Sequence, residues 1–272
     1  MVSIIIVSYN AKTLLKKCID SLKNNIHISY EIIVVDNNSE AETVEYLKSI
    51  ESFCKVIFNR ENVGFSKANN IGFMYAEGKV IHFLNPDTVV DESINILYEK
   101  VLNSPVGKVY STSLMENGKK IHGGHILPVF KNIYYLLTHK RLAKWYIGAS
   151  LLFHREDFQS VGRWNENYFM YSEDLDLCYQ VYKHNLIIEE IESNIIHLGG
   201  GTTTWNKSQK DLRKEKAYIR FFLINNMIIN YFAFSFSAII WNCMVHHEVN
   251  FVDRMALMAR ALYETCKEKY NK

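Results

Sequence analysis

Short apolar runs that alternate with helical patterns constrain the fold of this chain more than any other feature. The first run ends at residue 8, and apolar residues at helical spacing follow it, namely Leu14, Leu15, Cys18, Ile19 and Leu22. Further apolar runs lie at residues 32–35, 55–58 and 79–84, with helical patterns between them. Strands that alternate with helices predict parallel βαβ units and a sheet covered by helices on both faces. We therefore expect an α/β protein with a mostly parallel central sheet.

Size and composition limit the class of protein. The chain has 272 residues and is 48% hydrophobic, enough for one large α/β domain with or without an appendage. A formal net charge of +2 lacks the basic excess of a nucleic-acid binder, so we expect no nucleic-acid partner. Five scattered cysteines without a CxxC pair favour a reducing compartment and no structural zinc. The amino terminus does not resemble a secretory signal, and we expect a cytoplasmic protein.

Polar residues gather where the predicted strands end. Ser8 and Tyr9 close the first strand, Asp36 closes the second, and Asn85 and Asp87 follow the fourth. In open α/β sheets the ligand lies outside the carboxyl ends of the strands, so these side chains are expected at one site. The acidic segment SEDLDL and the segment IIHLGGGT come later in the chain. Carboxylates and a histidine in this pattern can hold a divalent metal against a diphosphate and deprotonate a hydroxyl, which indicates sugar transfer from a nucleotide-activated donor.

Seven motifs in order resemble glycosyltransferase family 2, and most of all its bacterial rhamnosyltransferase-like branch: SIIIVSYN, EIIVVDNNS, NVGFSKANNIG, LNPDT, GASLLFHRE, SEDLDL and IIHLGGGT. The resemblance implies a GT-A fold with a Rossmann-like sheet, a nucleotide-diphosphate sugar donor, a divalent metal (Mn²⁺ or Mg²⁺) and inversion at the anomeric carbon. It covers residues 1–210, where we expect a nucleotide-binding half at about 1–105 and an acceptor and catalytic half at about 106–210.

The ends of the first two predicted strands are expected to bind the nucleotide, and Ser8 belongs to the first of these ends. The ring of Tyr9 is placed to lie against the nucleobase, and Asp36, with Asn37 or Asn38, to pair with polar edges of base or ribose. Two structural interpretations stay open: Tyr9 as a packing aromatic at the strand end, and Asp36 as the N-cap of the next helix.

The segment NVGFSKANNIG is a second predicted nucleotide contact. Gly64 stands where the backbone must turn sharply or approach a ligand, and Asn69 is expected on the opening turn of a helix, whose positive end favours phosphate. Simple loop chemistry explains the glycine equally well. The segment is not a dinucleotide fingerprint, because GxGxxG is absent.

The tripeptide Asn85-Pro86-Asp87 departs from the family's usual Asp-x-Asp metal motif. An amide binds a hard cation more weakly than a carboxylate does, so we assign Asp87 to the metal and Asn85 to the donor. The resemblance implies that rhamnosyltransferase-like members share this departure. Asn-Pro-Asp is also a common turn sequence, and this simpler interpretation stays open.

The acidic segment is expected to supply the general base. Glu173, Asp174 and Asp176 open a predicted helix, where the dipole by itself favours carboxylates. Carboxylates held close together also raise each other's pKa towards the range useful for a base. Matching the family's Glu-Asp pair assigns the base role to Asp174, and Glu173 would orient or tune it.

The family's histidine before a glycine-rich turn matches His197, which the resemblance makes a metal ligand beside Asp87. A hydrogen-bonded structural histidine is the alternative. The glycine-rich loop with Trp205 is expected to close over the diphosphate and exclude water. Gly148 and Ala149 are predicted, with Trp205, to contact the acceptor, although small residues also permit tight strand packing.

Residues 211–272 are expected to form a helical appendage. The stretch 221–245 has no charged residue and is long enough to span a bilayer, but its four asparagines argue against insertion. The last twenty residues read as a charged amphipathic helix. We expect helices that dock on the domain and touch the inner face of the membrane, or that form a homo-oligomer contact; a buried core helix is the alternative.

These observations predict an inverting glycosyltransferase that uses a nucleotide-sugar donor, with dTDP-rhamnose first and UDP-hexoses or UDP-galactofuranose as alternatives. The expected acceptor is a bacterial cell-surface polysaccharide or a lipid-linked oligosaccharide. A catalytically silent sugar-nucleotide or glycan-binding module is the alternative from another class. A nucleotidyltransferase is disfavoured, because SYNAKT does not resemble the glycine-rich basic loop of those enzymes.

Overall fold

The computed structural model describes residues 1–116, 118–121, 124–130, 132, 142–199, 206–245 and 251–270. The chain divides into two compact units. The first comprises Met1–His125 and Lys144–Thr203, and the second comprises Ile126–Ala143 and Thr204–Lys272. The first unit contains the large sheet and most of the motifs, and the second contains the carboxyl-terminal helices.

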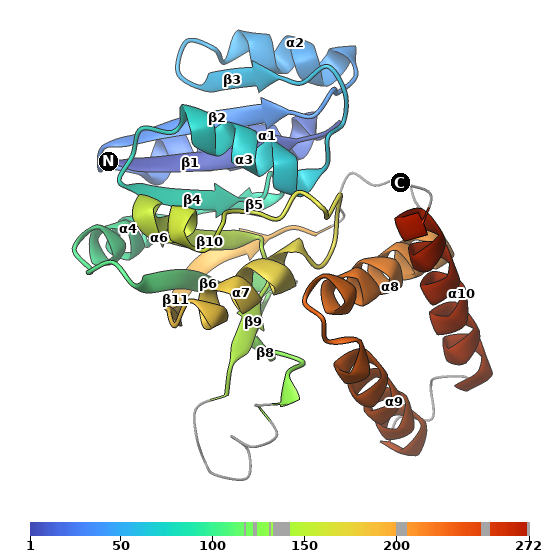
Figure 1. The fold of residues 1–272 in the computed structure, drawn as a ribbon. Coiled ribbons are helices and arrows are strands. Elements are labelled where there is room, and N and C mark those ends of the chain that lie inside the picture. Colours follow the sequence, from blue (N-terminus) through green and yellow to red (C-terminus); the bar gives the residue numbers. More distant parts are fainter. Residues whose placement is uncertain are drawn as a thin grey trace. The chain divides into compact units, whose positions relative to one another are not determined.

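The large sheet has nine strands among the described residues, in the order β3-β2-β1-β4-β10-β6-β11-β5, with β7 beside β6 (Figure 1). The strands are β1 (Val2–Ser8), β2 (Tyr30–Asp36), β3 (Lys55–Phe58), β4 (Val80–Leu84), β5 (Thr88–Val89), β6 (Lys108–Glu116), β7 (Lys119–Ile121), β10 (Ser150–His154) and β11 (Ile187–His197). A separate ribbon pairs β8 (Gly124–Ile126) with β9 (Lys144–Tyr146).

The strand directions confirm the expected mostly parallel sheet. Strands β1, β2, β3 and β4 are mutually parallel, and β6 and β11 run the same way, whereas β5, β7 and β10 run in the opposite direction. The register pairs Ser8 with Asp36. The predicted polar residues at these two strand ends are therefore direct neighbours.

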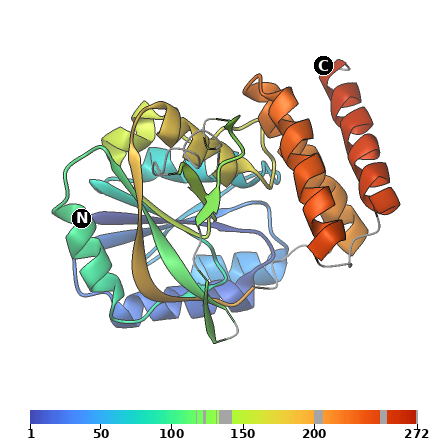
Figure 2. The same ribbon diagram turned by 90° about the horizontal axis from the view of Figure 1, so that it is seen from below.

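Helices cover both faces of the sheet, as the continuous apolar strands predicted (Figure 2). Helices α1 (Lys12–Asn25), α2 (Ala41–Ser49) and α4 (Ile94–Leu102) pack on one face, and α3 (Phe65–Tyr75), α6 (Arg155–Ser160) and α7 (Glu173–Lys183) pack on the other. Within β1, Ile4 and Ile6 belong to the first cluster, and Ile5 and Val7 to the second. The period of two in a strand sends successive side chains to opposite cores.

The second unit contains α8 (Lys207–Ile224), α9 (Ile228–Val245) and α10 (Phe251–Tyr270). The charge-free stretch is not one helix, because the chain turns between α8 and α9 at Asn226, whose φ is 56°. The buried Glu215 of α8 accepts hydrogen bonds from Tyr231 of α9 (2.8 Å) and Arg254 of α10 (3.0 Å), which ties the three helices together. No helix in the described part of the chain combines the length and the apolar character needed to cross a membrane.

Candidate active site

The ends of β1 and β2 carry buried polar atoms that lack partners. Ser8 and Asp36 are buried, and neither the Oγ of Ser8 nor the Oδ1 of Asp36 has a hydrogen-bond partner among the described residues. The other carboxylate oxygen of Asp36 accepts from the backbone N–H of Ser39 at 3.0 Å. Leaving such an atom unpaired costs about 1–3 kcal/mol, which makes a ligand contact a reasonable explanation. The next residue, Tyr9, is exposed at this edge.

The helix-cap interpretation of Asp36 is wrong, because the N-cap of α2 is Glu40 and no side chain caps that helix. The asparagines after β2 take different roles. The side chain of Asn37 donates to the carbonyl of Gly64 (3.2 Å) and accepts from the N–H of Val63 (3.2 Å), so it holds the loop before α3. Asn38 is exposed and has a φ of 66°. A structural role for Asn37 was not foreseen, because it depends on a residue 27 positions away.

Gly64 is the residue before α3, and its φ is 84°. A Cβ built there would lie 2.6 Å from the carbonyl oxygen of Phe169. The same oxygen accepts a hydrogen bond from the N–H of Phe65 at 2.8 Å. The close approach that requires glycine is therefore to the loop before α7. Asn69 is the fifth residue of α3, just beyond the predicted opening turn; it is buried, and its amide donates to the carbonyl of Phe65.

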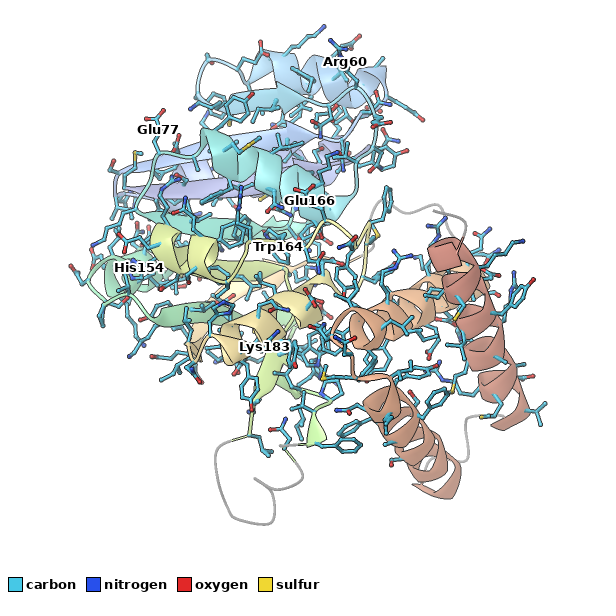
Figure 3. The ribbon with its side chains drawn as sticks, in the orientation of Figure 1. Arg60, Glu77, His154, Trp164, Glu166 and Lys183 are labelled. Carbon is cyan, nitrogen blue, oxygen red and sulfur yellow. The ribbon has the colours of Figure 1, made fainter. Side chains whose placement is uncertain are left out.

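A side chain of α3 also anchors the loop that leads to the acidic segment. Asn70 donates to the carbonyl of Trp164 (2.8 Å) and to the carboxylate of Glu166 (2.9 Å), and it accepts from the N–H of Trp164. Trp164 lies inside the first unit, and Glu166 lies close to α3 (Figure 3). The predicted nucleotide segment thus directly contacts the loop that leads to the predicted catalytic segment.

The tripeptide after β4 forms the turn that leads into β5. The N–H of Asn85 donates to the carbonyl of Ala149 at 2.9 Å, and its own carbonyl accepts from the hydroxyl of Thr88 at 2.7 Å. Its side-chain Oδ1 is buried and has no partner among the described residues. The turn interpretation is correct for the backbone, and the unpaired amide oxygen leaves room for a ligand contact as well.

Asp87 and His197 meet, although they are 110 residues apart in the chain. Nε2 of His197 lies 3.4 Å from Oδ2 of Asp87, and the N–H of Leu198 donates to the carbonyl of Asp87 at 2.8 Å. Antiparallel pairing of β11 with β5 brings the two together. The hydrogen bond to Asp87 is the main cause that raises the pKa of His197 to about 9, the contact with Glu116 adds to it, and burial opposes it.

The sequence analysis missed Glu116, the last residue of β6. Its carboxylate accepts from Nδ1 of His197 in a short hydrogen bond. Nothing local in the sequence marks this glutamate. The contact arises from the parallel pairing of β6 with β11, which sets Met115 opposite Ile196.

Asp87 and His197 could supply two of the ligands of a divalent cation. In the described part of the chain, no group of three or more His, Cys, Asp and Glu side chains forms a complete metal site. One carboxylate and one imidazole nitrogen 3.4 Å apart, with the unpaired oxygen of Asn85 on the same turn, are compatible with a cation whose coordination the donor phosphates complete. Such sharing with substrate phosphates is usual for Mg²⁺.

Glu173 and Asp174 begin α7, as predicted. Asp174 accepts from the N–H of Gly148 at 3.0 Å and from the N–H of Leu175 at 2.8 Å. Glu173 is buried, and its Oε2 has no partner among the described residues. Burial, and then the neighbouring charge of Asp174, raise the pKa of Glu173 well above its usual range. Burial also raises the pKa of Asp174, against the effect of its backbone hydrogen bonds.

The third acid of this segment has a different role. Asp176 is buried and accepts from the amide of Asn165 (3.1 Å) and from the hydroxyl of Tyr168 (3.4 Å). It therefore fastens the preceding loop to α7. Two consecutive residues of that loop, Tyr171 and Ser172, have left-handed φ values of 73° and 62°. Strained backbone of this type is held in place by its surroundings and is common at functional sites.

Gly148 and Ala149 connect the two halves of the site through their backbones. The side chain of Ala149 is buried in a core cluster, and a Cβ at Gly148 would lie 3.2 Å from the Cβ of Asp174 and 3.4 Å from the Trp164 ring. The tight-packing interpretation is thus correct for both, and their contact with an acceptor stays a prediction. Trp205 and the glycines at positions 200 and 201 lie outside the described residues.

The sheet order, the two helical layers and the carboxylates at the carboxyl edge of the strands define a GT-A glycosyltransferase fold. A mannosyltransferase from Pyrobaculum calidifontis, solved with GDP-Man and Mn²⁺, superposes with a TM-score of 0.63 over 98% of this chain and 75% of its own, at 14% identity. Residues 3–162 match the family described as Glycosyl transferase family 2, and the chain belongs to this family.

Two relatives have established names. The rhamnosyltransferase WbbL of Escherichia coli (strain K12) is 27% identical over 208 residues, which cover 65% of this chain and 75% of the relative. The E. coli protein named UDP-Glc:alpha-D-GlcNAc-diphosphoundecaprenol beta-1,3-glucosyltransferase WfgD is 27% identical over 130 residues, which cover 47% of this chain and 51% of the relative. The chain is therefore a glycosyltransferase with relatives in bacterial glycan synthesis.

Proposed function

We propose that this protein is an inverting glycosyltransferase that moves rhamnose from dTDP-rhamnose to a hydroxyl of a bacterial cell-surface polysaccharide or lipid-linked oligosaccharide. One observation supports this most. Ala149 accepts from the N–H of Asn85, and Gly148 donates to Asp174, so two adjacent residues join the turn of the metal motif to the base. A displacement at a single carbon needs the leaving group and the base this close together.

The donor nucleotide would bind at the ends of β1 and β2. The unpaired oxygens of Ser8 and Asp36 would bond to polar hydrogens of the base or ribose, and the exposed ring of Tyr9 would lie against the base. The unpaired oxygen of Asn85 would accept from a donor hydroxyl. These contacts satisfy atoms that the protein alone leaves without partners.

Asp87 and His197 would hold the divalent cation, which when bound supplies positive charge to the departing diphosphate. The remaining chemistry belongs to the side chains of α7. Asp174 would take the proton of the acceptor hydroxyl as that oxygen bonds to the anomeric carbon. The bond from this carbon to the phosphate oxygen breaks, the nucleoside diphosphate leaves, and the configuration inverts because attack comes from the opposite face.

Glu173 would remain protonated through this step. Two buried carboxylates side by side cannot both ionise without a large electrostatic cost, and Glu173 has a buried oxygen without a hydrogen-bond donor among the described residues. Asp174, with its two backbone N–H donors, is better able to carry the negative charge. A neutral Glu173 therefore allows Asp174 to stay ionised and accept the proton.

The name of the rhamnosyltransferase relative and Asn85 in place of the usual aspartate support dTDP-rhamnose. The relative whose name includes UDP-Glc supports a UDP-hexose as the alternative, and UDP-galactofuranose belongs to the same alternative. Thermal shift with dTDP, UDP and their sugars, each with and without MnCl₂, tests the choice. Stabilisation by dTDP and not by UDP is expected. Selective stabilisation by UDP would contradict dTDP-rhamnose and support a UDP-sugar as the donor.

We also propose a cytoplasmic protein whose second unit touches the inner face of the membrane. Ile229 and Phe232 of α9 are exposed, and α9 has no charged residue. The exposed Lys207, Arg213 and Lys214 of α8 suit anionic headgroups. Co-sedimentation with vesicles of anionic lipid should exceed that with neutral lipid and fall in high salt. A stable dimer that does not bind either vesicle would instead favour an oligomer contact.

A further inference from the structure

Glu116 occupies a position that no part of the proposed reaction yet uses. It ends β6, and its carboxylate bonds to Nδ1 of His197, while the opposite ring nitrogen lies 3.4 Å from Asp87. The three side chains are partly to mostly buried: 33% of Glu116, 17% of His197 and 11% of Asp87 are exposed. The arrangement is a line of carboxylate, imidazole and carboxylate.

The backbone fixes both ends of this line. Parallel pairing of β6 with β11 sets Glu116 beside His197, and antiparallel pairing of β11 with β5 sets His197 opposite Thr88. The N–H of Leu198 bonds to the carbonyl of Asp87. The backbone position of His197 is therefore fixed, which leaves the orientation of its ring and the choice of the nitrogen that carries a hydrogen.

A carboxylate at Nδ1 settles both variables. When the ring is neutral, Nδ1–H donates to Glu116, so the lone pair is on Nε2, the nitrogen beside Asp87. The negative charge of the carboxylate also makes Nε2 a stronger electron donor. Metal-binding histidines commonly have such a partner on the nitrogen that does not bind the metal.

Stabilisation of the fold is a weaker explanation for the pair. Among the described residues, Glu116 has no other side-chain partner. A pair with one partner a third exposed contributes little to stability, because solvent screens it. Glu116 contacts Nδ1, the ring nitrogen of His197 that faces away from Asp87. A role in stabilising the fold does not explain this choice of nitrogen.

We propose that Glu116 is a positioning residue that orients His197 for a divalent cation shared with Asp87. This inference rests on the proposed function, because it requires the metal site. It adds a residue outside the seven sequence motifs quoted above, one that would not bind the metal itself. Loss of such a partner typically weakens metal affinity about 10- to 100-fold.

Manganese binding to the full chain tests the proposal without any need for turnover. Free Mn²⁺ is measured by electron paramagnetic resonance in titrations with MnCl₂ alone and with MnCl₂ plus dTDP or UDP. Glu116→Ala should weaken Mn²⁺ binding about 10- to 100-fold, and Glu116→Gln by less, because an amide oxygen still accepts from Nδ1 but has no charge. Glu192→Gln is the matched control, since Glu192 is on the same strand as His197, its side chain is 81% exposed, and it pairs with Lys120.

A second measurement separates positioning from a general loss of structure. Excess MnCl₂ should restore the turnover of Glu116→Ala, whereas a misfolded protein would not recover. Thermal unfolding of the metal-free proteins should show Glu116→Gln within a few degrees of the unsubstituted protein. If Glu116→Ala does not fold, Mn²⁺ binding to Glu116→Gln tests the proposal.

The outcomes distinguish this inference from the proposed function. Loss of Mn²⁺ binding in Asp87→Ala and His197→Ala, with unchanged binding in both Glu116 variants, would overturn the role of Glu116 alone. Unchanged binding in Asp87→Ala and His197→Ala would overturn the metal site itself and this inference with it. Weakened binding in the Glu116 variants and in both ligand variants, with the Glu192 control unchanged, is the result that supports the proposal.

Discussion

The backbone N–H of Gly148 donates to Oδ2 of Asp174 across 3.0 Å, and the residue after Gly148 accepts from Asn85. Gly148 directly precedes Ala149 and β10, the antiparallel strand inserted between β4 and β6. The insertion of β10 thus places Gly148 and Ala149, the two residues before this strand, between the metal motif and the predicted base. The turn at Asn85 and the predicted base are therefore both tied to the residues that lead into this strand.

Gly148→Ala should lower turnover more than donor binding. The new Cβ would lie 3.2 Å from the Cβ of Asp174 and 3.4 Å from the Trp164 ring, so the carboxylate must shift by a few tenths of an ångström. Small errors in position reduce rates strongly, and we expect kcat to fall about 10- to 100-fold. Steady-state kinetics and nucleotide thermal shift on the same sample measure the two effects. Equal losses in kcat and nucleotide affinity would contradict the expectation.

Asp174→Asn should abolish turnover and leave donor binding nearly unchanged. A general base typically contributes about 10²- to 10⁴-fold, and an amide cannot accept the proton. Asp176→Asn is the matched comparison two residues away. Because Asp176 holds Asn165 and Tyr168, its substitution should lower the melting temperature more than Asp174→Asn does. Unchanged turnover in Asp174→Asn would falsify the assigned base, whereas absence of turnover in the unsubstituted protein would favour a silent binding module.

The stability contributed by Glu173 should depend on pH with a definite sign. Its folded-state pKa is raised above the ordinary 4.5, so its favourable protonated state is fully present below pH 4.5 and is lost as pH rises through the folded-state pKa. The free energy of unfolding of the unsubstituted protein should therefore fall relative to Glu173→Gln between pH 5 and pH 9. Denaturant unfolding at both pH values measures this difference. A difference that is constant across the range would show that Glu173 is not buried as a neutral acid.

Ser8→Ala should weaken nucleotide binding without destabilising the protein. The hydroxyl has no partner in the described structure, so its removal leaves no broken hydrogen bond inside the fold. If it bonds to the donor, the loss is about 0.5–1.5 kcal/mol of binding free energy, or roughly 2- to 13-fold in Kd. Calorimetry with dTDP and UDP measures the change. Thr112→Ala removes another buried hydroxyl without a partner, on β6, and should leave nucleotide affinity unaltered.

The sequence determined the local elements of this protein. Apolar periodicity predicted β1 to β4 and α1 to α3, because strand and helix periods depend only on neighbouring residues. The acids at 173 and 174, the turn at 85–87 and the histidine at 197 were found from their motifs. The order of those motifs was enough to indicate the family that the comparison then established.

Only the tertiary structure decided which of these groups act together. The antiparallel insertion of β10 set Gly148 against Asp174, and the pairing of β6 with β11 brought Glu116 to His197, 81 residues away. It also separated three similar acids: Asp176 anchors a loop, whereas Glu173 is buried with one carboxylate oxygen that has no partner among the described residues. Strand order in a sheet is set by packing between segments far apart in the chain, and local sequence patterns carry no record of it.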